Sequence, residues 1–217
     1  MISKIEGPPN TRLHPTPLRE LAHPAAAPSL RSARVKRTPF YLKEMIIVLT
    51  GSTAPGKTDT AWALVSLHER IVFLENDCFA LRKPFDSSNR EDLVTLYDQL
   101  LLNVQFHRKR GNTDFVITLS PPMAIIFPDM KFQFEALDPQ IFPFLLTCTR
   151  SEAARRIEER DRGEHQKEKE RRWLGEDIQI LNDSFPDESV FVRIDTTEID
   201  ELSVAEQIRN RIKSRTG

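Results

Sequence analysis

The chain has 217 residues, of which 39% are hydrophobic and 29% are charged, and this composition excludes a fibrous chain and a wholly disordered one. Its 31 Lys and Arg residues balance 32 Asp and Glu residues, so the formal net charge of −1 gives no overall positive field for nucleic acid or anionic membrane. No apolar run approaches the roughly 20 residues of a membrane helix, and the two cysteines have neither zinc-ligand spacing nor the number for a disulfide framework. We expect a soluble, cytoplasmic protein of one domain with an extension.

The extension covers residues 1–44, where seven of the 15 prolines lie and no helical or alternating apolar pattern is present. We predict that it is disordered. Its eight basic and three acidic residues weakly resemble an organelle transit peptide, although prolines break the amphipathic helix that such peptides form. A solvated tail and a true start at Met45 are the alternatives, and in each case residues 45–217 form the folded domain.

From residue 45 onward, short apolar runs alternate with amphipathic stretches, which is typical of a parallel sheet with crossover helices. The runs predict five strands, at 45–50, 71–75, 115–119, 142–148 and 190–194. A helix should begin near Thr58, and another should carry the apolar positions between 93 and 104, with Ser88 and Glu91 as a capping box and Gly111 as its stop. The same box spacing recurs at Thr149 and Ser203, ahead of two further helices. These elements predict an α/β fold in three layers around a five-stranded parallel sheet.

The loop after the first strand carries the most specific motif of the chain, because it matches G-x-x-x-x-G-K-[ST], the Walker A pattern, between a strand and a helix. Such glycines let backbone amides approach phosphate oxygens, the lysine reaches the β and γ phosphates, and the final hydroxyl ligates Mg²⁺. We therefore expect ATP and Mg²⁺ as cofactors. Pro55 has no N–H, so this loop offers one donor fewer than usual. The predicted ATP-binding residues of the loop are Gly51, Ser52, Thr53, Ala54, Pro55, Gly56, Lys57 and Thr58, with Thr58 as the metal ligand.

Beyond the loop, the chain has an acidic residue after the second strand, Asp77, an Arg-rich segment after the fourth, and Asp195-Thr196-Thr197 before the last helix. With these features residues 45–215 resemble the small P-loop kinases of the shikimate kinase, gluconate kinase and chloramphenicol phosphotransferase type. The resemblance implies the NMP-kinase-like variant of the P-loop NTPase fold and transfer of the γ-phosphate of ATP to a hydroxyl of a small molecule.

The resemblance also implies roles for individual residues. Asp77 would be the general base that faces the acceptor hydroxyl, a role that suits a carboxylate at the carboxyl end of a strand, and capping of a turn is the alternative. Glu75 is less favoured, since strand alternation would turn it aside if Asp77 points inward. Asp77 would also bind the acceptor, together with Phe79, Arg82 and Lys83. The two cations would suit a phosphorylated or carboxylated acceptor, and solvated surface cations are the alternative.

Residues 155–172 are mostly charged, and one interpretation is a solvated helix of mixed charge. The resemblance implies instead a mobile lid whose Arg156 and Arg160 close over the phosphates and take part in catalysis with Lys57, with Gly163 as a hinge. It further places Thr196 and Thr197 near the adenine base, with strand-end capping as the alternative.

Other nucleotide-binding classes fit less well. A GTPase is disfavoured because no N-K-x-D follows the fourth strand, and a mechanical ATPase because the third strand lacks the terminal aspartate. A nucleoside or nucleotide kinase is the nearest alternative, and a non-catalytic nucleotide-binding regulator is the next. We expect an ATP-dependent kinase with a small-molecule acceptor and no nucleic-acid or membrane partner, while the acceptor and the oligomeric state stay open.

Overall fold

The computed structural model describes residues 44–78, 86–137 and 139–216. The extension predicted over residues 1–44 therefore lies outside the described residues, apart from Glu44. The elements in chain order are β1 (Met45–Gly51), α1 (Lys57–Leu67), β2 (Ile71–Glu75), the 3-10 turn η1 (Asn76–Cys78), α2 (Arg90–Arg108), β3 (Asp114–Thr118), α3 (Pro121–Glu135), β4 (Gln140–Thr147), α4 (Arg150–Glu159), α5 (Glu164–Ser184), β5 (Val192–Asp195) and α6 (Glu201–Thr216).

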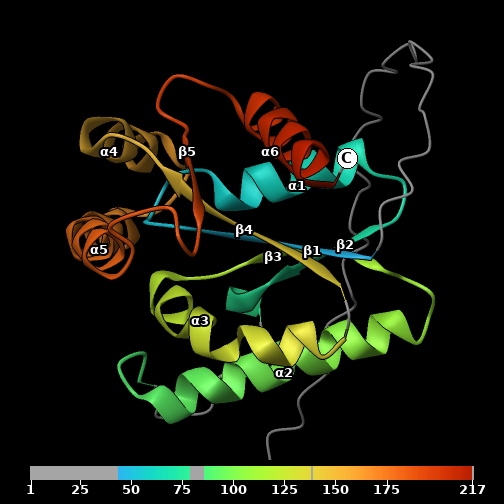
Figure 1. Ribbon diagram of the computed structural model, residues 1–217. Helices are drawn as coiled ribbons and strands as arrows, with labels where there is room; N and C mark the ends of the chain where they lie inside the picture. The colour runs from blue at the N-terminus through green and yellow to red at the C-terminus, as the bar shows by residue number, and fades with distance from the viewer. Residues whose placement is uncertain (1–43, 79–85, 138, 217) are drawn as a thin grey trace, which may run out of the picture. The chain divides into compact units, whose positions relative to one another are not determined.

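The sheet has five strands in the order β2-β3-β1-β4-β5, and every neighbouring pair is parallel. Helices α1 and α6 cover one face and α2 and α3 cover the other (Figure 1). The central strand β1 is buried throughout, because Ile46 and Val48 pack toward α2 and α3 while Ile47 and Leu49 pack toward α1 and α6. The three-layer α/β fold with five parallel strands is therefore confirmed.

Two predicted helix caps are wrong. Helix α2 begins one residue later than predicted, since the side chain of Asn89 accepts a hydrogen bond from the Glu91 amide at 2.8 Å and Ser88 bonds to Asp86 instead. Helix α6 begins at Glu201, and Asp200 accepts from the Ser203 amide at 2.7 Å, so Ser203 lies inside the helix. The cap of α2 is the Asn directly after the predicted serine, and the cap of α6 is the Asp three residues before the predicted serine, since either residue type caps helices well.

Two other helix ends follow the prediction. Thr149 caps α4 through the Glu152 amide at 3.3 Å. Gly111 follows the end of α2 with φ at +85°, a left-handed conformation that glycine adopts without strain.

Helix α3 was not predicted from the sequence. Prolines occupy its first two positions, where a backbone N–H would have no partner within the helix, so proline loses no hydrogen bond there. Pro128 lies inside the helix. Met123, Phe127, Met130 and Phe134 lie on its buried face. Among the described helices, α3 included, none is both long enough and apolar enough to span a lipid bilayer.

Candidate functional site

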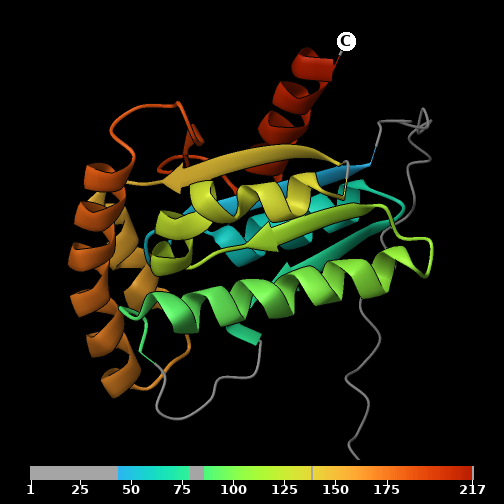
Figure 2. The ribbon, with the colours of Figure 1, turned by 60° about the horizontal axis from the view of Figure 1, so that its bottom comes forward.

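The phosphate loop lies where β1 ends, at the carboxyl edge of the sheet, and α5 stands beyond the arrowheads of β3 and β4 (Figure 2). A Cβ on Gly51 would lie 2.4 Å from the carbonyl oxygen of Leu146, so only glycine fits beside β4. Gly56, with φ at +89°, turns the chain into α1. Both glycines of the motif thus have a structural requirement here, and the amino end of α1 points its positive dipole at the loop.

Lys57 folds back along this loop. Its Nζ donates to the carbonyl oxygens of Gly51, at 2.9 Å, and Ser52, at 2.7 Å. Burial lowers the pKa of Lys57, while the nearby carboxylates of Asp177 and Asp77 act in the opposite direction. The ammonium group is therefore the positive centre of a site that also holds at least two carboxylates.

Thr58 and Glu75 meet at the base of the loop, where the Thr58 hydroxyl donates to Oε1 of Glu75 at 2.6 Å. The expectation that Glu75 turns aside is wrong: the chain leaves the strand conformation at η1, so strand alternation does not separate Glu75 from Asp77, and both line one cavity. A hydroxyl and a carboxylate are hard oxygen ligands that suit Mg²⁺, which commonly binds through one or two protein groups together with substrate phosphates.

Asp77 lies on the turn η1, which the buried side-chain amide of Asn76 ties to the start of α3. Asn76 Oδ1 accepts from the Ser120 amide at 3.0 Å, and its Nδ2 donates to the Ser120 hydroxyl at 3.3 Å. Burial raises the pKa of Asp77, while Lys57 opposes the shift. The predicted general base Asp77 therefore lies on a turn that hydrogen bonds fix in place, and it faces the same cavity as Lys57.

Asp177 is a residue of the site that sequence reasoning missed. Its Oδ2 accepts from the backbone amide of Thr53 at 3.0 Å and from the Thr53 hydroxyl at 2.8 Å. Burial raises the pKa of Asp177, and the Thr53 hydrogen bond and Lys57 counteract the shift. Its helix continues well beyond the lid predicted to end at residue 172, and the apolar spacing of Leu174, Ile178 and Leu181 is the signal that could have extended it.

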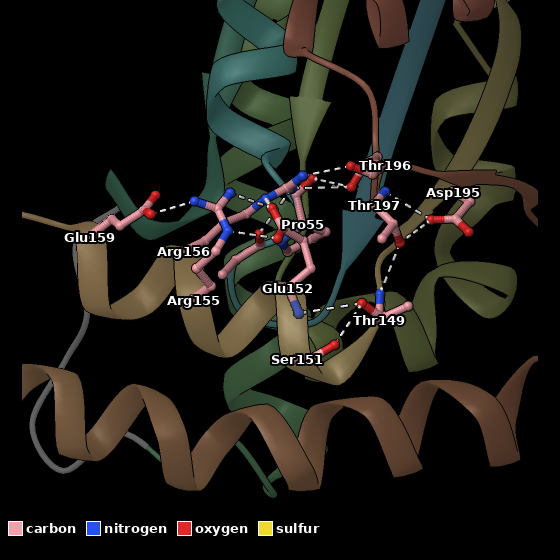
Figure 3. A network of polar contacts seen from close by, with 11 residues as sticks. Pro55, Thr149, Ser151, Glu152, Arg155, Arg156, Glu159, Asp195, Thr196 and Thr197 are labelled. Atoms are coloured by element: carbon pink, nitrogen blue, oxygen red, sulfur yellow. Dashed lines mark hydrogen bonds and ion pairs between the residues drawn. The ribbon is translucent and has the colours of Figure 1, made fainter.

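Arg156 and Thr196 hold the other side of the loop (Figure 3). Arg156 donates to the Thr196 carbonyl oxygen at 2.5 Å and to that of Ala54 at 3.4 Å, while Glu152 accepts from its Nε at 2.7 Å. The Thr196 hydroxyl donates to the carbonyl oxygen of Pro55 at 3.0 Å. Pro55, which has no N–H, is thus anchored through its carbonyl group. Arg156 contacts the phosphate loop as well as its own helix.

Thr197 makes strand-end contacts. Its hydroxyl donates to Asp195 Oδ1 at 2.5 Å and accepts from the Thr149 amide at 3.0 Å (Figure 3). The Thr197 hydroxyl therefore makes the contacts of the capping alternative, whereas the Thr196 hydroxyl bonds to the phosphate loop. The proximity of either residue to a base stays a prediction.

Arg160 lies just after α4, where its Nη1 donates to Glu170 Oε2 at 2.9 Å. Arg162 pairs with the other oxygen of Glu170, whose side chain is only 3% exposed. The predicted lid, 155–172, thus consists of the end of α4, a short junction and the start of α5, and Gly163 lies at that junction as the N-cap of α5. Closure of this segment stays a prediction.

Two cavities, of about 580 and 570 Å³, flank the loop. Pro55, Gly56 and Arg160 line both of them. The first cavity is bordered by side chains of α4, the segment after β5 and α6, among them Arg156, Thr196, Thr197 and Val204. The second is bordered by the loop, η1, the start of α3 and α5, among them Lys57, Thr58, Glu75, Asp77 and Asp177. The phosphate loop therefore lies between the two cavities. The predicted acceptor residues Phe79, Arg82 and Lys83 lie outside the described residues.

No protein-family model matches the chain, and no curated protein matches its sequence. Solved structures do match. The tunicamycin resistance protein of Deinococcus radiodurans superposes with a TM-score of 0.55 at 16% identity, over 78% of this chain and 96% of that protein. Shikimate kinase from Acinetobacter baumannii has a TM-score of 0.53 at 18% identity, over 78% of this chain and 93% of that protein. A gluconokinase from Sinorhizobium meliloti has a TM-score of 0.54 at 16% identity, over 80% of this chain and 94% of that protein. At these identities the likeness shows the fold, which is the P-loop kinase fold that the sequence predicts.

Proposed function

We propose that the chain is an ATP- and Mg²⁺-dependent kinase that transfers the γ-phosphate to a hydroxyl group of a small molecule. The observation that carries the proposal is the convergence of Lys57, Thr58, Glu75 and Asp77 on one cavity beside the phosphate loop, with a second cavity of similar size on the other side of that loop. The similarity in fold to shikimate kinase and a gluconokinase supports it, because both are named as kinases of small hydroxylated molecules.

In this mechanism the nucleoside lies in the cavity beside Arg156 and Thr196, and the acceptor lies in the cavity beside Asp77. Thr58 and Glu75 would hold Mg²⁺, which supplies positive charge to the β and γ phosphates when bound. Lys57 adds a second positive charge at the loop and stabilises the transferring group. Arg160, which borders both cavities and acts electrostatically on Lys57, would add a further positive charge there.

Asp77 orients the acceptor hydroxyl and accepts its proton as the new bond forms between the hydroxyl oxygen and the γ-phosphorus. The bond between that phosphorus and the oxygen bridging to the β-phosphate breaks, and ADP leaves with the electron pair. Asp77 must be ionised to accept the proton, and because burial raises its pKa, activity should rise with pH through a midpoint above the ordinary value of an aspartate.

The test is Mg²⁺-dependent ADP production from ATP against a panel of sugars, amino sugars, antibiotics, nucleosides, nucleotides and hydroxy acids. We expect one chemical class to stimulate turnover, and Lys57→Met and Asp77→Asn to reduce it by about 100-fold or more. Matched controls are Lys109→Met and Asp98→Asn, which remove the same charges from two exposed positions, the C-cap of α2 and a residue within that helix. ATP binding without stimulation by any acceptor, and no effect of Asp77→Asn, would favour the non-catalytic regulator instead.

A further inference from the structure

The second cavity is lined by more carboxylates than cations. Arg160 and Arg162 both pair with the buried Glu170, and Lys57 donates to two loop carbonyls, so each cation in the described part of this wall already has an oxygen partner. The six acidic residues of the lining are Asp59, Glu75, Asp77, Glu170, Glu176 and Asp177, and the three basic ones are Lys57, Arg160 and Arg162. The described wall is therefore poorly suited to an anionic acceptor.

A bound nucleotide would increase the excess of negative over positive charge in this cavity. Asp177 Oδ2 lies 3.0 Å from the Thr53 amide of the phosphate loop, so triphosphate oxygens in the loop would face a carboxylate of the same charge. A magnesium ion between Thr58 and Glu75 would lie at the base of the loop, near β2 rather than on α5. Lys57 is the cation that acts on Asp177, and it would also face the triphosphate, while Glu176 adds a further negative charge on α5. A positively charged ligand would therefore be favoured on the α5 side of the cavity when ATP is bound.

The form of the site favours an organic cation over a second metal ion. The carboxylates are dispersed, since no three acidic, His or Cys side chains of the described residues come together as a metal cluster. Beside them, Trp173 and Ile180 are 42% and 37% exposed on the same helix, at a spacing that places them on one face with Glu176 and Asp177. An exposed indole next to carboxylates suits a molecule with an ammonium group and an apolar or ring-shaped body.

We propose that the acceptor is an amine-bearing hydroxyl compound, whose ammonium group binds to Asp177 and Glu176 on α5 while its hydroxyl faces Asp77. The proposal rests on the proposed kinase function, and it names the class of substrate. In this proposal Asp177 and Glu176 determine specificity, because they favour an acceptor with a positive charge. Asp77 acts on the reacting hydroxyl.

The first test is binding, measured by calorimetry on the full chain saturated with Mg²⁺ and a non-hydrolysable ATP analogue. The probes are glucosamine and kanamycin as amines, glucose as a neutral analogue, and glucuronate as an anionic one. We expect the amines to bind about tenfold or more tightly than glucose and glucuronate. Equal or weaker binding of the amines, or no binding of either amine, would overturn the proposal.

Substitutions on α5 test which carboxylates bind the ammonium group. Glu176→Gln and Asp177→Asn should each weaken binding of the amine probes by about tenfold and leave glucose unchanged. Glu176→Gln is the cleaner change, because its carboxylate is exposed and Asp177 is bonded to the loop. The control is Asp183→Asn, an exposed aspartate of the same helix outside the cavity lining. Loss of binding in Asp183→Asn as large as in Glu176→Gln would assign the effect to general charge and contradict the proposal.

ADP production with the same probes separates this inference from the proposed function. Turnover stimulated by the amines supports both. Turnover stimulated by glucose or glucuronate alone overturns the amine specificity and leaves the kinase intact. Binding of the amines that depends on Glu176, without turnover by any acceptor, supports the amine site and contradicts the kinase.

Discussion

The carboxylate of Asp177 accepts hydrogen bonds from both the amide and the hydroxyl of Thr53, and so ties α5 to the phosphate loop across 124 residues of sequence. The contact occupies a backbone donor that a phosphate oxygen would use. It also places a carboxylate where burial disfavours its charge, since burial raises the pKa of Asp177. Because burial disfavours its charged form, we expect the Asp177 carboxylate to lower the free energy of unfolding at neutral pH.

Asp177→Asn should therefore raise the midpoint of thermal unfolding at pH 7 in the absence of nucleotide. A folded-state pKa above the ordinary value means that the folded state binds the proton more tightly than the unfolded state, so stability falls as pH rises through that range. The gain should disappear near pH 3, where the carboxyl group is protonated in both states. Thermal scans at the two pH values, with Asp183→Asn as the control, measure the difference. A lower midpoint at pH 7 would mean that the bonds to Thr53 and the charge of Lys57 outweigh the burial.

Glu170 has the opposite pH dependence. Burial opposes its charge, but hydrogen bonds from Gln166, Arg160 and Arg162 prevail and lower its pKa. Its contribution to stability is therefore complete above the ordinary pKa of a glutamate, and it is lost as pH falls through the lower folded-state value. Glu170→Gln should reduce the free energy of unfolding at pH 7 by about 1 to 3 kcal/mol, discounted for the partial exposure of both arginines.

Urea unfolding at pH 7 and pH 3 measures this effect, and the deficit of Glu170→Gln relative to wild type should shrink at the lower pH. Glu168→Gln, on the exposed side of the same helix, is the matched control. A deficit that is equal at both pH values would assign the loss to packing rather than to the charge.

Thr196→Val tests the anchor of the loop. The change removes the hydroxyl that donates to Pro55 at 3.0 Å and leaves the side-chain shape nearly the same, so a buried carbonyl group loses its partner. We expect a loss of about 1 to 2 kcal/mol in the free energy of unfolding and weaker binding of ATP. Fluorescence titration with a labelled ATP analogue measures the affinity, and Thr95→Val on the exposed side of α2 is the control. Unchanged nucleotide affinity would show that the loop holds its shape without this contact.

Contiguous signals in the sequence were sufficient for the sheet and the phosphate loop. All five strands were found, because a buried parallel strand is a local run of apolar residues, and the loop was found because its motif occupies eight consecutive positions. The 3-10 turn after β2 was not foreseen, and it is this turn that brings Glu75 and Asp77 to one cavity. Asp177 could not be assigned from the sequence because its relation to Thr53 depends on how α5 crosses the carboxyl edge of the sheet.

Glu75→Gln tests the metal site at the base of the loop. The Thr58 hydroxyl lies 2.6 Å from Glu75 Oε1, and an amide keeps the size of the carboxylate while removing its charge. We expect the Mg²⁺ concentration for half-maximal binding of the ATP analogue to rise about tenfold, because charged oxygen ligands bind Mg²⁺ more tightly than neutral ones. Mg²⁺ titrations at fixed analogue concentration measure this, with Glu69→Gln, an exposed residue between α1 and β2, as the control. If the Mg²⁺ requirement stays the same while Thr58→Ala raises it, the hydroxyl holds the ion and Glu75 serves only to orient that hydroxyl.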